Sequence, residues 1–145
     1  MTAAGGEKPA YRWRHVIPFA ETNVVGNVYF SHHVAWQGHT REMFLRDHAP
    51  GILKDLAGGL RLVTLRTACE YFQELTAFDE VEVAMRLQSL DRNRINLAFE
   101  YHRLDPHPGL VAEGSQSLAC MRLGPTGLVP TAVPAELAAA LAAYR

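Results

Sequence analysis

The chain has 145 residues and a mass of 16.1 kDa, which is the size of one domain. It is 48% hydrophobic and 20% charged, so it can bury a core without disulfides or metal, and wholesale disorder is excluded. Lysine and arginine number 14 against 15 acidic residues, which leaves a formal net charge of −1. This balance gives no general attraction to nucleic acid or to an anionic membrane, and we expect neither as a partner.

The cysteines and histidines predict no metal site, and we expect no cofactor. Cys69 and Cys120 are too few for a disulfide framework and lack metal-ligand spacing, so we expect two buried thiols. His32, His33 and His39 have no acidic or cysteine partner at ligand spacing. No stretch approaches the roughly 20 apolar residues of a membrane span, and no apolar secretion signal opens the sequence. These features predict a cytoplasmic protein.

The first residues predict a tail, a strand and a loop. Residues 1–10 are small and polar and are expected to form a disordered tail, followed by a single domain over residues 11–145. Alternating side chains over residues 11–17 predict a strand. Residues 21–27 combine asparagine and glycine, which tolerate turn geometry, and therefore predict a loop.

A long helix is predicted to follow this loop. Ser31 suits a helix N-cap, and residues 32–47 carry core-type side chains mostly three and four positions apart. The Ala-Pro-Gly segment at 49–51 ends the helix, residues 52–56 add one further turn, and the glycines at 58–59 form a hinge into strand sequence.

The rest of the sequence predicts four long strands and a terminal helix. Residues 60–75 are rich in β-forming side chains, and residues 80–90 and 95–101 alternate cleanly on either side of a short polar turn. Residues 110–123 predict the last strand, and an alanine-rich helix opens at Pro134. One long helix against a curved antiparallel sheet is an α+β arrangement.

Three motifs occur in an order that resembles a known family. F-A-E-T-N-V-V-G-N-V-Y-F at 19–30 is followed by W-Q-G-H-T-R-E-M-F at 36–44 and C-E-Y-F-Q-E-L at 69–75. The chain resembles, from about residue 11 to 123, hotdog-fold thioesterases of the 4-hydroxybenzoyl-CoA type, whose central helix follows an acidic D-x-D-x-x-G-x-V-Y-F loop. It most resembles the thioesterases of enediyne polyketide biosynthesis. The resemblance implies a long central helix wrapped by a curved antiparallel β-sheet of about five strands, with a short C-terminal helix.

The resemblance also implies a catalytic group. Asn23 stands where the wider family has its catalytic aspartate, and the enediyne members share this asparagine. An amide is not basic enough to take a proton near neutral pH, so it can only orient water or donate a hydrogen bond. By resemblance, Arg41 acts with Asn23, and the backbone N–H of Phe30 polarises the thioester carbonyl. Glu21 and Glu42 are the nearby carboxylates that could supply acid–base chemistry.

We expect an acyl-binding channel beside these groups. Tyr29 and Thr64 are candidates for its wall. The candidates for an apolar tunnel are Leu62, Leu65, Tyr71, Phe72, Met43 and Phe44.

Structural roles compete with these assignments. Asn23 precedes Gly26 and could be only a turn residue. Arg41 could be a solvated helix residue paired with Glu42 or Asp47. Tyr29 could belong to the core, and Cys69 has no paired base that would make it a nucleophile.

The resemblance implies hydrolysis of a β-keto polyene acyl thioester on the acyl carrier domain of an iterative enediyne polyketide synthase. The product would be a β-keto acid that can decarboxylate to a methyl ketone or polyene. The alternatives are a general acyl-CoA thioesterase and a non-catalytic acyl-binding hotdog protein. Lys8 and Lys54 are the only lysines, and no basic cluster suits CoA phosphates, which favours a carrier protein. By resemblance we expect a homodimer or homotetramer with sites at the dimer interface.

Overall fold

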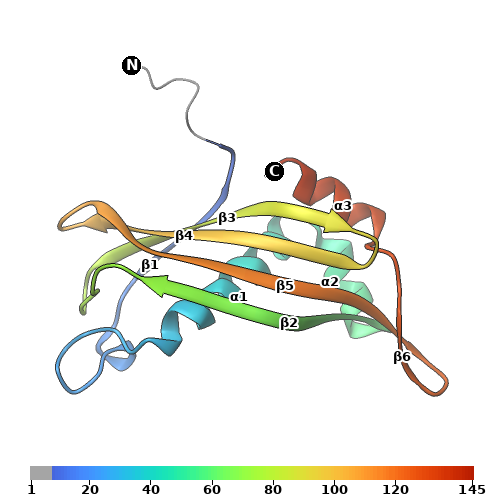
Figure 1. Cartoon of the computed structure of the whole chain (residues 1–145), viewed down its shortest axis with the longest axis horizontal. Coiled ribbons are helices and arrows are strands. Elements are labelled where there is room, and N and C mark those ends of the chain that lie inside the picture. The colour runs from blue at the N-terminus through green and yellow to red at the C-terminus, as the bar shows by residue number, and fades with distance from the viewer. Residues whose placement is uncertain (1–7) are drawn as a thin grey trace.

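The computed structural model describes residues 8–145 (Figure 1). Of the predicted disordered tail, residues 1–7 lie outside the described part, and residues 8–10 precede the first strand without regular structure. Within the described part, no helix is both long and apolar enough to cross a membrane.

The N-terminal elements follow the predicted order. They are β1 (Tyr11–Val16), the 3-10 turn η1 (Phe19–Glu21), the long helix α1 (Ser31–His48) and α2 (Pro50–Ala57). The predicted N-cap Ser31 is instead the first residue of α1, because Phe30 already has helical dihedral angles and serves as the N-cap. The single further turn predicted after α1 is a separate helix, α2.

Six strands form one antiparallel sheet. The remaining elements are β2 (Leu60–Tyr71), β3 (Glu80–Asp91), β4 (Arg94–Asp105), β5 (Gly109–Gly124), β6 (Gly127–Pro130) and α3 (Ala135–Ala142). The five main strands lie in the order β1-β3-β4-β5-β2, and β6 pairs with β5 as a short addition that the sequence did not predict. The sheet curves around α1, as Figure 1 shows, so the α+β hotdog arrangement is confirmed.

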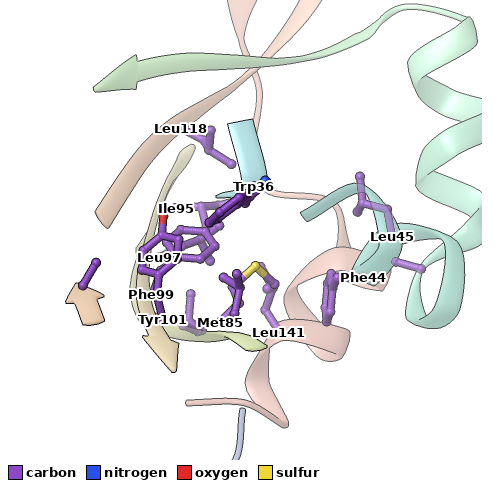
Figure 2. Packing of buried hydrophobic residues seen from close by; sticks show 14 of the residues in the cluster. Trp36, Phe44, Leu45, Met85, Ile95, Leu97, Phe99, Tyr101, Leu118 and Leu141 are labelled. Carbon is purple, nitrogen blue, oxygen red and sulfur yellow. The ribbon is translucent and has the colours of Figure 1, made fainter. Parts of the chain in front are cut away.

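The alternation in β3 and β4 builds the inner wall of the core. Met85 pairs with Phe99, and Leu87 pairs with Leu97, and all four side chains are buried. Figure 2 shows side chains from α1, β3, β4, β5 and α3 turned toward one another, with Trp36 from α1 against this wall. Apolar side chains at every second strand position thus face the helix and exclude water.

The buried face of α1 is half polar. It consists of His33, Trp36, Gln37, Thr40, Phe44 and Leu45, at the three- and four-residue steps of a helix face. The Thr40 hydroxyl donates to the Trp36 carbonyl at 2.7 Å, which satisfies it within the helix. Gln37 instead needs partners from the sheet, and His33 finds none among the described residues.

His33 is a buried imidazole without hydrogen bonds in the described part of the chain. Its side chain is 3% exposed, and its ring centroid lies 4.8 Å from that of Tyr71 and 4.9 Å from that of Trp36. Burial lowers the pKa of His33 from 6.5 to about 4. The ring is therefore neutral at physiological pH.

We expect His33 to make the protein acid-labile. Its pKa is lower in the folded than in the unfolded chain, so stability present above pH 6.5 falls as the pH drops to about 4. The full loss is on the order of 3 kcal/mol. Urea unfolding of the wild type and of His33→Phe at pH 7.5 and pH 4.5 measures this loss of unfolding free energy. The difference in unfolding free energy between the two pH values should shrink in the variant, and an unchanged difference would contradict the assignment.

Candidate active site

Asn23 holds its own loop together. Its Oδ1 accepts the backbone N–H of Val25 at 3.0 Å and that of Asn27 at 3.2 Å, and its backbone N–H donates to the Asn27 carbonyl at 2.7 Å. Gly26 closes the turn at φ +93°, a region that favours glycine. Since two N–H groups fix Oδ1 as the acceptor, the free end of the amide is Nδ2, which has no acceptor among residues 8–145. Asn23 therefore offers hydrogen-bond donors only.

The start of α1 lies beside this loop. Its N-cap residue Phe30 follows Tyr29, whose backbone N–H donates to the Glu21 carbonyl at 2.9 Å. Within the described chain, no acceptor bonds the backbone N–H of Phe30. The Phe30 carbonyl accepts the Tyr71 hydroxyl at 2.7 Å, which ties β2 to the helix start. A free N–H at a helix N-terminus favours negative charge on a bound oxygen.

A cavity of about 470 Å³ opens at this place. This volume lies within the usual range for ligand sites, about 300–1,000 Å³. The cavity brings together five of the predicted site residues: Asn23, Tyr29, Phe30, Tyr71 and Phe72. Val28, Leu75, Asn27, Gln73, His33 and Glu74 complete its lining. Tyr29 is 48% exposed, so it belongs to the wall of this cavity and not to the core.

The carboxylates expected to supply acid–base chemistry lie elsewhere. Glu21 Oε1 is 2.6 Å from His15 Nε2, and Glu21 Oε2 accepts the Trp36 indole N–H at 3.1 Å, so this side chain fastens the loop to β1 and α1. Glu42 is exposed on α1, and neither residue lines the cavity. The carboxylate in the lining is Glu74, which the sequence reasoning missed although it belongs to the C-E-Y-F-Q-E-L motif.

Arg41 lies in a different part of the molecule. It borders a narrow cavity of about 10 Å³ between α1, the sheet and α3, together with Phe44 and Leu62. Its Nη1 donates to Gln116 Oε1 at 2.7 Å, and it forms no ion pair with residues 8–145. Of the two carboxylates considered above as partners, Asp47 binds the Arg46 guanidinium and the Tyr11 hydroxyl instead. Glu42 attracts the Arg41 guanidinium electrostatically but forms no hydrogen bond with it. Burial lowers the pKa of Arg41, which a guanidinium tolerates without losing its proton near neutral pH.

The predicted tunnel residues do not form one tunnel within a single chain. Tyr71 and Phe72 line the large cavity, whereas Phe44 and Leu62 line the narrow one. The other two tunnel candidates, Leu65 and Met43, border neither cavity, and neither does Thr64, the candidate for the channel wall. Thr64 and Leu65 are exposed on β2 at a bulge in its pairing with β5, and Met43 is half-buried on α1.

Comparison with solved structures confirms the fold. The chain is 54% identical to the dynemicin thioesterase, over 93% of this chain and 96% of that one, with a TM-score of 0.91; crystal structures of that enzyme concern induced-fit and allosteric effects upon polyene binding. A 1,4-dihydroxy-2-naphthoyl-CoA thioesterase from Synechocystis is 17% identical, with a TM-score of 0.79 and coverage of 92% and 96%. A 4-hydroxybenzoyl-CoA thioesterase mutant is 14% identical, with a TM-score of 0.77 and coverage of 91% and 98%. At such identities these two show the fold alone.

A comparison with curated proteins finds no match. The family model described as the thioesterase-like superfamily matches residues 17–141, which include the Asn23 loop, α1 and all strands except β1. Together with the 54% identity over nearly the whole chain, this match confirms the resemblance inferred from the motifs. The chain belongs to the thioesterase-like superfamily and has its hotdog fold.

Proposed function

We propose that the chain hydrolyses a β-keto polyene acyl thioester held on the acyl carrier domain of an iterative enediyne polyketide synthase. The observation that carries the proposal is the cavity of about 470 Å³ at the start of α1, where donors and aromatic walls meet. The 54% identity to the dynemicin thioesterase, a protein studied for polyene binding, supports the class of acyl chain.

The donors suggest how the thioester reacts. The Phe30 N–H and the Asn23 Nδ2 group are both free to bond an oxygen that becomes negative when water attacks the carbonyl carbon. The tetrahedral intermediate then breaks its C–S bond, the carrier sulfur leaves with the proton lost by the attacking water, and the product is a β-keto acid, which can lose carbon dioxide. The β-keto group already makes the carbonyl carbon electrophilic, so no strong base is needed.

In this proposal a second copy of the chain brings its Arg41 to the Asn23 loop, which the Arg41 of the same chain does not reach. Asn23 and Arg41 border different cavities, and β2 leaves one edge of the sheet unpaired, with residues 64–67 exposed. An open edge of this length favours pairing with another strand. We propose a homodimer paired along β2, in which Arg41 of one copy serves the Asn23 loop of the other, and a homotetramer of two such dimers.

The cavity favours a carrier-bound substrate over acyl-CoA. Its lining contains no lysine or arginine that could bind the CoA phosphates. Arg103 lies nearby, but its guanidinium already bonds the Gln73 side chain and the carbonyls of Glu74 and His107. A general acyl-CoA thioesterase is therefore the weaker candidate.

Steady-state hydrolysis tests the function. The same β-keto polyene acyl group is offered on a carrier domain and on CoA, and we expect the higher kcat/KM with the carrier. Equal values would remove the carrier preference, and tight binding without turnover would make the protein a non-catalytic acyl binder. Co-expression with the cognate synthase should yield a free polyene or methyl ketone only when this chain is present.

Substitutions at Asn23 separate its role in holding the loop through Oδ1 from its role as a donor to the substrate through Nδ2. Asn23→Asp keeps an oxygen acceptor for the Val25 and Asn27 N–H groups but removes the Nδ2 donor. We expect a stable protein whose kcat falls about 10–1000-fold. Asn23→Ala should lose both loop stability and turnover. If Asn23→Asp hydrolyses the β-keto thioester at the wild-type rate, the donor role is wrong.

Substitutions at Arg41 test the guanidinium. It gives parallel hydrogen bonds from a fixed plane, whereas lysine offers one mobile charge, so Arg41→Lys should keep part of kcat and Arg41→Ala very little. Melting temperatures of both variants control for folding. Wild-type turnover in Arg41→Ala would remove the arginine from the mechanism.

A further inference from the structure

A network of hydrogen bonds, most of them partly buried, runs from the edge strand β2 to Arg41. Thr67 Oγ donates to Gln37 Oε1 at 2.8 Å, and Gln37 Nε2 donates to the Ala68 carbonyl at 3.0 Å. Gln116 Nε2 also donates to Gln37 Oε1, at 3.3 Å, and Gln116 Oε1 accepts Arg41 Nη1 at 2.7 Å. These hydrogen bonds therefore join α1 to both β2 and β5.

Both side-chain amides in this hydrogen-bond network, those of Gln37 and Gln116, have a fixed direction. Gln37 Oε1 accepts two hydrogen bonds while its Nε2 faces a carbonyl, so the amide of Gln37 cannot be reversed without losing its partners. Gln116 must then present its nitrogen to Gln37 and its oxygen to Arg41. Gln37 is fully buried and Gln116 is 5% exposed, which makes an unpaired amide at either position costly.

The backbone makes room for this arrangement at one position. A Cβ on Gly114 of β5 would overlap Gln37 Nε2 and lie 2.9 Å from the Ala68 carbonyl oxygen. The absence of a side chain at Gly114 thus allows the Gln37 amide to reach the β2 backbone between the two strands.

The hydrogen-bond partner of Arg41 is neutral. A partly buried guanidinium usually pairs with a carboxylate, and such a pair cancels its charge. Here the neutral amide of Gln116 fixes the position of Nη1, and the Glu42 carboxylate attracts the guanidinium without a hydrogen bond to it. The remaining N–H groups of Arg41 have no acceptor among residues 8–145. A guanidinium with free donors suits an anionic oxygen.

We propose that Gln116, held by Gln37 and Thr67, is the positioning residue that presents Arg41 to the anionic oxygen of the acyl substrate. This inference rests on the proposed function, in which Arg41 acts on the thioester. Gln116 does not itself touch the substrate; it sets the direction of Arg41 and keeps its charge available.

A double-mutant cycle tests the proposal with the purified protein and a β-keto acyl thioester. Gln116→Met keeps the side-chain length but removes both hydrogen bonds, and we expect kcat to fall about 10–100-fold because Arg41 loses its direction. In the Arg41→Ala background the same change should have no further effect on kcat. Multiplicative losses in the double mutant would overturn the proposal. If Gln116→Met fails to fold, Gln116→Asn retains an amide but withdraws it from Arg41, and the same result is expected.

A second variant tests the charge. Gln116→Glu leaves a partner for Arg41 but cancels its charge, so kcat should fall at least as far as in Gln116→Met; wild-type turnover would refute the charge argument. Asn96→Leu is the matched control, because Asn96 is a hydrogen-bonded amide of β4 that bonds Ser89 and Ser117 and lies outside both cavities. It should lower the melting temperature and leave kcat unchanged.

Two results separate the inference from the function on which it rests. Wild-type turnover in Arg41→Ala would remove Arg41 from the proposed mechanism. An inactive Arg41→Ala combined with a fully active Gln116→Met would leave Arg41 in the mechanism and overturn only the positioning by Gln116.

Discussion

The rest of the structure depends on satisfying the polar side chains that α1 buries. The helix lies against the sheet (Figure 1), and the fully buried Gln37 and the half-buried Arg41 find their partners on its strands. β2 and β5 supply those partners, and Gly114 provides the space. The register between helix and sheet is consequently fixed by directional hydrogen bonds as well as by apolar packing.

The same helix divides the molecule into two chemical regions. Its N-terminal end offers donors, from the Phe30 N–H and the Asn23 amide, beside a large cavity with aromatic walls. Its middle carries the Arg41 guanidinium, with free donors, beside a narrow apolar cavity. Glu21 is occupied by Trp36 and His15, and the carboxylate that lines the large cavity is Glu74. Stabilisation of developing negative charge is the chemistry that these residues can perform.

Repeating patterns made the fold predictable, whereas the site was predictable only in part. Alternation placed β3 and β4, and the motif around Asn23 placed the loop before α1. The direction of the Asn23 amide depends on which backbone N–H groups lie near it, and no pattern encodes that. Glu74 lines the cavity because the chain after β2 turns back across the helix start, where the Leu75 carbonyl accepts the Val28 N–H. The predicted tunnel residues likewise divide between two cavities because of how the helix and strands pack in three dimensions.

The open edge of β2 has a consequence for any copy of the chain that is alone. A strand of twelve residues with unpaired N–H and C=O groups is a template for strands of other molecules. The exposed Arg66 and the bulge near Leu65 limit flat stacking, but they do not cover the edge. A variant that blocks the proposed association along β2 should therefore give aggregates at high concentration instead of a well-behaved monomer, and dilution would be needed to handle it.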